Sequence, residues 1–420
     1  MGYVDLKYKP TKDDLITLFR VEPAKGYSMK KVAEHIASES SIGTWTEVKT
    51  MKKQIRKLGA KVFSIKGRWI KVAYPSELFE GGNMPEILSS IAGNIFGMKV
   101  IEKLRLQDIQ WPNSIIKSFR GPQFGIPGVR RTLRVKKRPL VGTIVKPKLG
   151  LNEKEHAKVA YDAWLGGCDL VKDDENLSSQ KFNRFEKRVV ETLKLRDKAE
   201  RETGERKAYM PNITAETNEM TKRAKFVKKN GGEYVMVDIL TVGWSALQTI
   251  REITEDLGLI IHAHRAGHAA FTRGNHGISM IVVADIARII GVDQLHIGTV
   301  IGKMEGKKEE VLEIEEEIEH EFIKERARKL SEKWYGLKPV FAVCSGGLYP
   351  GLVPRLLKLM GRNIIIQAGG GIHGHPLGTI AGAMAMRQAV DASLRGIDLR
   401  DYANSHKELK LAIEKWGVLK

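Results

Sequence analysis

The stretch that decides the fold reads Gly166-Gly167-Cys168-Asp169-Leu170-Val171-Lys172-Asp173-Asp174-Glu175-Asn176. A short apolar strand runs directly into one lysine and three consecutive carboxylates. Three like charges in a row repel one another, and burying any of them without a counter-charge costs several kcal/mol. A hard cation such as Mg2+ relieves that cost, because it prefers carboxylate oxygens and leaves positions open for substrate. A cation does not ligate a cation, so Lys172 fits such a site only if it is neutral or modified.

The same pattern of an apolar strand followed by polar residues repeats from about residue 140 onward. Each apolar, β-branched run ends in glycine, polar or charged residues, and an amphipathic helix follows. Strands that are almost wholly apolar suit a parallel sheet covered on both faces. Eight such units predict a closed (β/α)8 barrel rather than an open doubly wound sheet. The expected strands are Leu140–Val145, Asp169–Val171, Ala208–Thr214, Tyr234–Leu240, Leu257–His262, Gln294–Val300, Val340–Val343 and Asn363–Gln367.

Residues before about 120 show a different pattern, in which helical and strand-like pieces alternate. This is typical of a separate α+β domain. The Gly/Pro-rich stretch at 121–128 marks the boundary. We therefore predict an α/β fold with a smaller α+β domain at residues 1–120 and a (β/α)8 TIM barrel with a C-terminal helical tail at residues 121–420. Helices are expected at Met29–Ala37, Met84–Ile91, Glu153–Leu165, Ser245–Asp256, Ser279–Ile290, Thr379–Leu394 and, highly charged, Glu309–Trp334.

Composition places the chain among soluble globular proteins. It has 420 residues, of which 42% are hydrophobic and 29% charged. No apolar run reaches the length of a membrane span, and the first residues lack a signal-peptide core, so a cytoplasmic protein is expected. The two cysteines, Cys168 and Cys344, lie in or beside apolar runs. Buried thiols are expected there, not a disulfide framework.

The net charge of +20 indicates an anionic partner. Nucleic acid, a phosphorylated metabolite and an anionic membrane are the candidates, although a lysine-rich solvated surface contributes too. The densest basic run, Arg130–Arg138, alternates apolar and basic residues as a solvated strand or connector does. The sequence has no RNA-binding aromatic signature, zinc-ligand spacing or basic zipper, so nucleic acid is not the expected partner. A membrane is not expected as a partner either.

Ionisable or glycine-rich groups follow nearly all eight expected strands, where a (β/α)8 barrel carries its chemistry. The last two glycine motifs follow strands seven and eight, the location that this fold favours for phosphate, because glycine lets backbone N–H groups approach an anion. A hard metal, two anion-binding regions and several lysines suit a doubly phosphorylated sugar whose carbonyl is polarised while a neighbouring proton is removed. The strand-end groups are Lys146, Lys148, Lys172–Glu175, Asn212, Asp238, His262–His268, His296, Lys303, Ser345–Gly347 and Gly369–Gly371.

The histidines after the expected strands differ in their expected roles. His262 and His264 lie on one face of the expected strand, but no further ligand nearby completes a tetrahedral zinc site. We expect His264 and His296 to transfer protons or to hydrogen-bond substrate. Structural roles are expected for His262, His268, His373 and His375.

These elements together resemble the large subunit of ribulose-1,5-bisphosphate carboxylase/oxygenase (Rubisco). The resemblance covers nearly the whole chain, and its Lys-Asp-Asp-Glu element with distant lysines is highly specific. In length and sequence the chain most resembles the archaeal form III enzymes. The pieces that carry the resemblance are Lys146–Gly150, Gly166–Asn176, His264-Arg265, His296–Gly306, Ser345–Gly347, Glu39–Thr46 and Gly93–Gly97.

The resemblance implies that Lys172 reacts with activator CO2 to form a carbamate, an anionic oxygen ligand. Mg2+ would then be held by this carbamate, Asp174 and Glu175, with Asp173 as a supporting neighbour. The carbamate would take the C3 proton of ribulose-1,5-bisphosphate. The resulting enediolate attacks CO2, or O2 in the oxygenase reaction. After carboxylation, water adds at C3 and cleavage between C2 and C3 gives two molecules of 3-phosphoglycerate.

The resemblance also implies the remaining roles. Lys146 would protonate the product carbanion, Lys303 would stabilise the new carboxylate from a mobile loop, and His264 would transfer protons and bind substrate. Arg265 and His296 would bind one phosphate. The other implied substrate-binding positions are Thr44, Trp45, Gly347, Gly369 and Gly370 for the second phosphate, and Lys148, Ser345, Gly346, Glu39 and Asn94 for further contacts.

In this family the N-terminal domain completes the barrel site of a partner subunit. A homodimer is therefore the expected minimal unit, with further assembly of dimers and no small subunit. Resemblance to form III implies a role in nucleotide or pentose-phosphate salvage.

The chain departs from the family pattern at a few positions. Gly267 stands where Met is usual, Ile42 where many members have Thr, and Ile144 where plant-type enzymes often have Thr. The C-terminus is short, so lid closure is expected to differ from that of the plant-type enzyme.

Two other functions compete with the carboxylase. A Rubisco-like enolase or isomerase shares the fold but usually loses part of the carboxylation set, whereas Lys146, Lys303, Glu39 and Asn94 are all present here. A basic nucleic-acid-binding module on an inactive barrel predicts salt-dependent binding and has no need for the strand-end cluster. The sequence favours the carboxylase over both.

Overall fold

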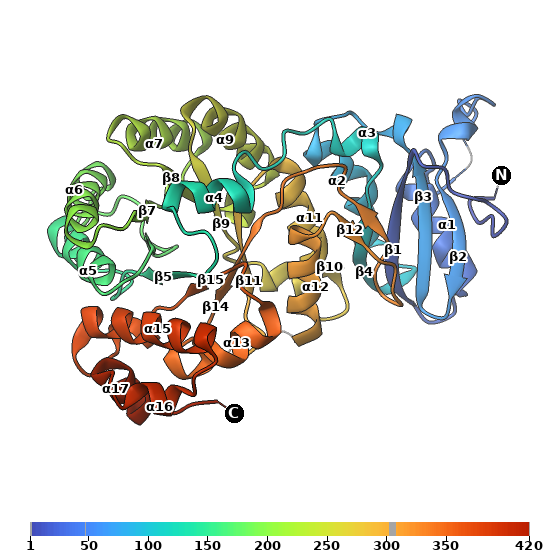
Figure 1. The fold of residues 1–420 in the computed structure, drawn as a ribbon. Helices are drawn as coiled ribbons and strands as arrows, with labels where there is room; N and C mark the ends of the chain where they lie inside the picture. The colour runs from blue at the N-terminus through green and yellow to red at the C-terminus, as the bar shows by residue number, and fades with distance from the viewer. Residues whose placement is uncertain (1, 47, 302–307, 420) are drawn as a thin grey trace. The chain divides into compact units, whose positions relative to one another are not determined.

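The computed structural model describes residues 2–46, 48–301 and 308–419 of the chain (Figure 1). It forms two compact units. The first contains Met1–Gly121, Gly267–Ile290 and His320–Leu337, and the second contains Pro122–Ala266, Gly291–Glu319 and Lys338–Lys420. The sequence predicted a single domain boundary after residue 120. It did not predict that Gly267–Ile290 and His320–Leu337 also belong to the first unit.

The first unit is built on a five-stranded sheet. Its β1 (Asp14–Pro23) is antiparallel to both β3 (Trp69–Pro75) and β4 (Ile101–Gln110). The sheet continues with β2 (Lys61–Lys66) beside β3 and β10 (Gly277–Ile278) beside β4. The sheet is antiparallel except for the parallel pairing of β10 with β4, and its combination with helices confirms the α+β class of this unit.

Helix α1 (Met29–Glu39) covers this sheet. The Ser28 side chain accepts the Lys31 N–H at its start, which satisfies one of the open donors of the first turn. The α1 residues Val32, Ala33 and Ile36 are buried at helical spacing. The other helices and strands of the unit are α2 (Met84–Ala92), α3 (Asn113–Ile116), α10 (Ala269–Thr272), α11 (Met280–Ile290), β12 (Phe322–Ile323) and β13 (Glu332–Lys333).

The second unit is the expected barrel. Eight parallel strands follow one another in the order β7-β6-β5-β15-β14-β11-β9-β8. An isolated parallel bridge between Asn212 and Met236 joins the β7 end of this sheet to β8, so the barrel is nearly closed. The strands are β5 (Leu140–Ile144), β6 (Leu170–Lys172), β7 (Ala208–Met210), β8 (Tyr234–Asp238), β9 (Ile260–His264), β11 (Gln294–Gly298), β14 (Phe341–Ser345) and β15 (Ile364–Gln367).

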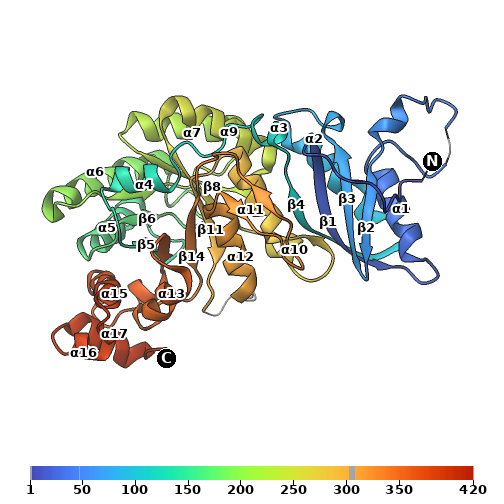
Figure 2. The ribbon, with the colours of Figure 1, turned by 45° about the vertical axis from the view of Figure 1, so that its right-hand side comes forward.

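A helix follows each strand in the chain, which confirms the (β/α)8 class. Within the second unit, helices lie outside the barrel strands (Figures 1 and 2). The helices of this unit are α4 (Gly125–Leu133), α5 (Glu153–Leu165), α6 (Phe185–Thr203), α7 (Thr217–Lys229), α8 (Ile239–Val242), α9 (Trp244–Leu257), α12 (Lys308–Glu319), α13 (Val353–Met360), α14 (Gly370–His373), α15 (Gly378–Arg395), α16 (Leu399–Ala403) and α17 (Lys407–Trp416).

Helix α4 closes the N-terminal end of the barrel. Its residues Ile126, Val129 and Leu133 belong to one buried cluster with residues from the beginnings of the strands, such as Leu140 and Leu170. A barrel plugged at this end leaves its open face at the C-terminal ends of the strands, where this fold carries its chemistry.

One expectation about secondary structure was wrong and another was confirmed only in part. The helix expected at Glu309–Trp334 ends at Glu319, and the chain continues as the β12–β13 hairpin. Burial overrides local helix preference there, because Trp334 is fully buried beneath the Arg288 guanidinium, 4.4 Å from its ring centre. The basic run Arg130–Arg138 is no strand, because its first part lies in α4 and only the remainder is a connector.

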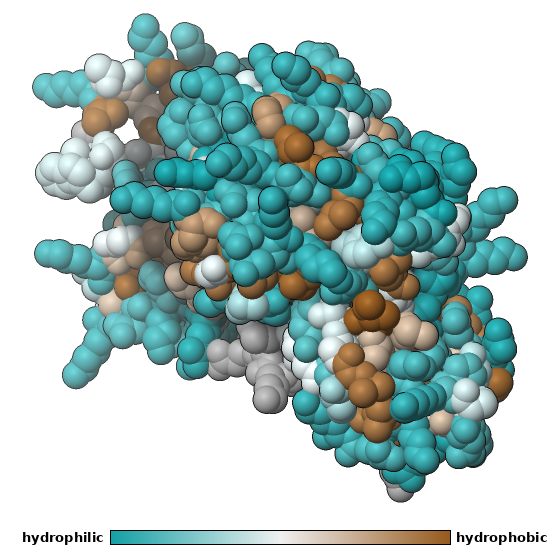
Figure 3. All heavy atoms as spheres, turned by 90° about the vertical axis from the view of Figure 1, so that its left-hand side faces the viewer, coloured by the Kyte–Doolittle hydropathy of each residue, from teal (hydrophilic) through white to brown (hydrophobic). Residues whose placement is uncertain are grey.

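Hydrophilic side chains cover most of the face drawn in Figure 3. Cys168 and Cys344 are both buried and free. Burial raises the pKa of the Cys168 thiol to about 12, so both cysteines act as small packing residues. Among the described residues, no helix has both the length and the apolar character needed to cross a membrane.

Candidate active site

Lys172 is the last residue of β6 and is almost completely buried, with 1% exposure. Its Nζ donates to the backbone oxygen of Asp173 at 2.9 Å and to Glu175 Oε2 at 3.3 Å. The Met236 sulfur lies 3.5 Å from the same nitrogen. The lysine is therefore held inside the mouth of the barrel beside a carboxylate.

Asp173 points into the protein between the strands and the surrounding helices. It accepts hydrogen bonds from the Tyr209 hydroxyl at 2.6 Å, the Asn212 backbone N–H at 2.9 Å and Arg188 Nε at 3.1 Å. His156 Nε2 lies 3.0 Å away. Burial opposes ionisation, but Arg188 and His156 outweigh it and hold the pKa of this carboxyl well below its usual range. Asp173 is thus a structural anion that anchors the start of the loop after β6.

Asp174 and Glu175 have different surroundings from Asp173. Asp174 accepts from Lys146 Nζ at 2.7 Å and from the Asn176 side chain at 3.1 Å. Burial opposes its ionisation, but Lys146 lowers its pKa overall. For Glu175, burial is likewise outweighed by Lys172 and by His264, whose Nε2 lies 3.7 Å from its carboxylate. Both carboxylates are charged and face the lysines at the strand ends.

These groups supply two anionic ligands for a hard cation. Within residues 2–46, 48–301 and 308–419, no group of three His, Cys, Asp or Glu side chains is arranged to hold a metal ion. Mg2+ takes oxygen ligands, and an unmodified lysine offers none. The Asp174 and Glu175 carboxylates are oxygen ligands of the kind that Mg2+ binds, and an oxygen group added to Lys172 would supply a third.

His264 is oriented by a neighbouring strand. Its Nδ1 lies 2.7 Å from Asp238 Oδ1. A carboxylate accepts, so Nδ1 carries the proton in this bond and Nε2 faces Glu175. An imidazole held in this way can exchange a proton at Nε2 with a bound substrate.

His262, Gln294, His296 and Ser345 form a buried hydrogen-bond relay. Gln294 Oε1 lies 2.7 Å from His262 Nδ1, the two Nε2 atoms of His262 and His296 are 2.9 Å apart, and His296 Nδ1 lies 2.9 Å from Ser345 Oγ. Burial lowers the pKa of His262 to about 3 and that of His296 well below its usual value, so both rings are neutral.

The direction of this relay follows from the Gln294 oxygen, which can only accept. His262 therefore donates from Nδ1 and accepts at Nε2, His296 donates from Nε2, and Ser345 donates its hydroxyl proton to His296 Nδ1. Both nitrogens of His296 are engaged, so a phosphate contact by His296 has to replace one of these bonds. The Ser345 oxygen keeps its lone pairs for a donor on the substrate.

The candidate phosphate-binding groups are also at strand ends. Burial lowers the pKa of Arg265 to about 10, which leaves its guanidinium charged at neutral pH. A Cβ on Gly298, which has φ +95°, would stand 2.8 Å from Arg265 Nη2, so glycine makes room for this side chain. Gly369 precedes the short helix α14, and Gly370 lies in its first turn, where N–H groups are open to an anion.

The remaining predicted residues fall into three groups. Lys148, Gly347 and Gly370 are exposed, while Gly346 is partly exposed. In the first unit, Asn94 Nδ2 lies 3.4 Å from Glu39 Oε1, so the structure brings these two together, whereas Trp45 is 86% exposed and Thr44 precedes it in the same loop. Lys303 lies outside the described residues.

The roles of several residues around the site were not predicted from the sequence. Asp238 and Asn212 were noted at strand ends, but their partners were not. Asn212 Nδ2 bonds the backbone oxygens of Glu175 and Leu177 and so holds the loop that carries the carboxylates. The relay role of Gln294 has no local sequence signal, because it depends on a pairing between neighbouring strands. The same holds for the Asp173 partners His156, Arg188 and Tyr209.

A nearly closed parallel barrel with ionisable groups at its strand ends defines a (β/α)8-barrel enzyme. Comparison with known families is more specific. The family "Ribulose bisphosphate carboxylase large chain, catalytic domain" matches residues 125–416, and the corresponding N-terminal domain family matches residues 2–115. The chain belongs to the ribulose bisphosphate carboxylase (Rubisco) large-chain family.

Full-length relatives include the following proteins. Ribulose bisphosphate carboxylase of Methanosarcina mazei is 53% identical over 99% of this chain and 98% of its own length. That of Methanocaldococcus jannaschii is 54% identical over 99% of this chain and all of its own. The dimeric Rubisco of Hyperthermus butylicus has a TM-score of 0.95 at 49% identity, covering 99% of both chains. An octameric Rubisco from Pyrococcus horikoshii has a TM-score of 0.93 at 49% identity, covering 100% of this chain and 97% of that one.

Proposed function

We propose that this chain carboxylates ribulose-1,5-bisphosphate to two molecules of 3-phosphoglycerate, with O2 as a competing substrate. The observation that carries the proposal is the convergence of Lys172, Asp174 and Glu175 at the end of β6, with Lys146 and His264 against the same carboxylates. Family membership and the names of full-length relatives support it.

Lys172 is proposed to be the activation site. Its amine attacks CO2 and releases a proton, and the carbamate so formed joins Asp174 and Glu175 as an oxygen ligand. Bound Mg2+ would polarise the substrate carbonyl and stabilise the developing enediolate. The burial of Lys172 at the mouth of the barrel, with its Nζ 3.3 Å from Glu175 Oε2, supports this arrangement.

The proposed proton transfers use residues that the structure brings together. The Lys172 carbamate takes the C3 proton, and His264, held by Asp238, exchanges protons at Nε2. Lys146, which lies against Asp174, delivers a proton to the product carbanion after the C2–C3 bond breaks. Lys303 is proposed, from the family resemblance alone, to hold the new carboxylate.

The phosphates are proposed to bind at two places on the barrel mouth. Arg265 and His296 take one, and Gly347, Gly369 and Gly370 take the other, together with the partner subunit's Thr44 and Trp45. Lys148, Ser345 and Gly346 are proposed to contact the sugar. The His296 contact requires the relay bond to His262 or Ser345 to open.

We further propose a homodimer, or an assembly of dimers without a small subunit, in which Glu39, Thr44, Trp45 and Asn94 serve the partner's barrel. The dimeric and octameric archaeal structures support this. Assignment to form III, a role in nucleotide or pentose-phosphate salvage and a cytoplasmic location remain predictions from the sequence.

The activity is tested by incorporation of labelled carbon. The protein is incubated with CO2 and Mg2+, ribulose-1,5-bisphosphate and 14C-labelled CO2 are added, and acid-stable radioactivity is counted. Label recovered in 3-phosphoglycerate, dependent on the bisphosphate, is expected. Consumption of the bisphosphate without incorporation would instead indicate an enolase or isomerase.

A further inference from the structure

A basic cleft opens at the N-terminal face of the barrel, the face opposite the proposed active site. Arg138, Asp169 and Arg206 each lie just before a strand, β5, β6 and β7 respectively, which places the cleft at the beginnings of these strands. Its volume is about 440 Å3. The lining residues are Leu133, Arg134, Val135, Lys136, Lys137, Arg138, Asp169, Gly204, Glu205, Arg206 and Arg387.

Three of the six cationic side chains in this lining have acidic partners. Arg138 forms two hydrogen bonds with Asp169, both at 2.6 Å. Arg387 Nη2 lies 3.2 Å from Glu205. Arg206 pairs with two acids outside the lining, Glu200 at 2.8 Å and Glu233 at 2.6 Å. These paired groups form the framework of the cleft and stabilise the barrel end.

The other three cations, Arg134, Lys136 and Lys137, are exposed. Their side chains make no hydrogen bond or ion pair with any residue that the structure describes. Like charges gathered around a concave surface repel one another and raise the local positive potential, which an anion would relieve. Neighbouring acids do not supply that relief, because Asp169 and Glu205 are already paired.

The backbone of the segment that carries these cations is held in place by Arg130. Arg130 Nη1 donates to the backbone oxygens of Val135 at 3.2 Å and of Arg138 at 3.0 Å. Arg134 has φ +57°, a left-handed conformation that residues with a Cβ rarely adopt, and it turns the chain at the end of α4. A cation cluster with a fixed backbone loses little freedom when it binds an anion.

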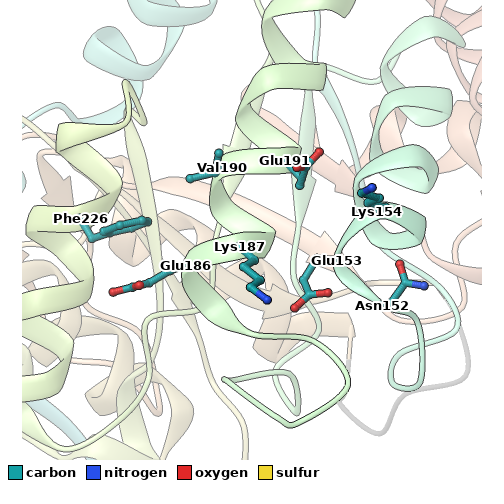
Figure 4. A pocket seen from close by; sticks show the side chains of 8 residues that line it. All are labelled: Asn152, Glu153, Lys154, Glu186, Lys187, Val190, Glu191 and Phe226. Carbon is teal, nitrogen blue, oxygen red and sulfur yellow. The ribbon is translucent and has the colours of Figure 1, made fainter.

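We propose that this cleft binds a small polyphosphate anion, such as the phosphate chain of inorganic tripolyphosphate or of a nucleoside triphosphate. Its volume is within the range of about 300–1,000 Å3 that is typical of small-molecule sites. The hollow in Figure 4 provides a contrast. It is larger, about 650 Å3, but its lining holds two lysines, Lys154 and Lys187, and three glutamates, Glu153, Glu186 and Glu191, so it has no excess of positive charge.

Site-resolved lysine labelling tests the proposal on the full chain, because a bisphosphate-binding active site can also take up polyphosphate. The protein is treated with an amine-acylating reagent with and without sodium tripolyphosphate, at constant ionic strength, and modification is read by mass spectrometry. Labelling of Lys136 and Lys137 is expected to slow by about fivefold or more, since charge-assisted contacts shield the amines. Lys222 and Lys225, exposed on α7, are the matched controls and should not change.

A charge-reversed variant gives a second readout. Lys136→Glu with Lys137→Glu should weaken binding of tripolyphosphate to this site by about tenfold or more, as loss of two ion pairs and added repulsion require. Lys222→Glu with Lys225→Glu changes the net charge equally and should leave binding intact. If ATP protects Lys136 and Lys137 from labelling as well as tripolyphosphate does, the site recognises the phosphate chain. If ATP protects them more strongly, the site also recognises the nucleoside.

Two results would overturn the proposal. One is equal slowing of labelling at Lys136, Lys137 and the α7 control lysines. The other is protection by single-stranded RNA at phosphate concentrations where tripolyphosphate has no effect, which would make the cleft a nucleic-acid surface.

Discussion

Asp173 and Asp174 are neighbours in sequence, yet the structure predicts opposite consequences for the same substitution. Asp173→Asn removes the counter-charge of Arg188, and both side chains have 0% exposure. Removing one partner of a buried ion pair costs about 3–5 kcal/mol, because the other charge stays buried. The asparagine oxygen can still accept from Tyr209 or Asn212, which favours the lower end of that range.

For a folded unit of this size, each kcal/mol lost from the free energy of unfolding lowers the melting temperature by about 2 °C. Asp173→Asn should therefore melt about 6–10 °C below the unsubstituted protein. Asp174→Asn is the matched control. The Asp174 side chain is 2% exposed, but its partner Lys146 is 34% exposed and stays solvated when the carboxylate is replaced, so the loss is about 1 kcal/mol or less. We expect its melting temperature to change by no more than about 2 °C.

Both variants are compared by thermal unfolding followed with circular dichroism and by the carbon-incorporation assay. Asp174→Asn should lose Mg2+-dependent carboxylation while remaining folded. Asp173→Asn, at a temperature where it is folded, should retain carboxylation. If Asp173→Asn melts like the unsubstituted protein, or if Asp174→Asn is the destabilised variant, the assignment of the two carboxylates is wrong.

Two further predictions concern polar groups of the barrel. Gln294→Met removes the acceptor that sets the direction of the relay, so it should lower the free energy of unfolding by about 1–3 kcal/mol. In this variant, 15N spectra should show His296 in two tautomers, and a single tautomer would contradict the proposed direction of the relay. His373 has a pKa lowered by burial to about 4, whereas an unfolded histidine has a pKa of about 6.5. Between these values the unfolded chain binds more protons, so stability should rise with pH across this window and fall on acidification. His373→Gln should flatten the dependence of the melting temperature on pH, and an unchanged slope would show that His373 does not contribute.

The barrel could be predicted because its strands are short, apolar and each followed by a polar terminus. Helix α5 has the expected bounds, since Asn152 and Glu155 form a capping box that fixes its start. The end of the Glu309–Trp334 helix at Glu319 could not be predicted, because burial of Trp334 is a tertiary effect that local helical periodicity does not report.

Part of the candidate active site could be predicted from the sequence for a similar reason. Lys172, Asp174 and Glu175 are adjacent in sequence, so their convergence needs only one strand end. The sequence does not separate Asp173 from Asp174, since that distinction depends on Arg188 and Tyr209 from other elements. Pairings across strands, such as Asp238 with His264, likewise appear only when the register is known.

The central claim, that Lys172 becomes the missing anionic ligand, has a direct test in 13C NMR with 13CO2. The protein is incubated with 13CO2 and Mg2+, and Lys172→Arg is measured alongside as a variant that keeps the positive charge but cannot form the carbamate. We predict a carbamate resonance that is stabilised by Mg2+ in the unsubstituted protein and lost in Lys172→Arg. A resonance that persists unchanged in Lys172→Arg, or full carboxylation by that variant, would contradict the claim.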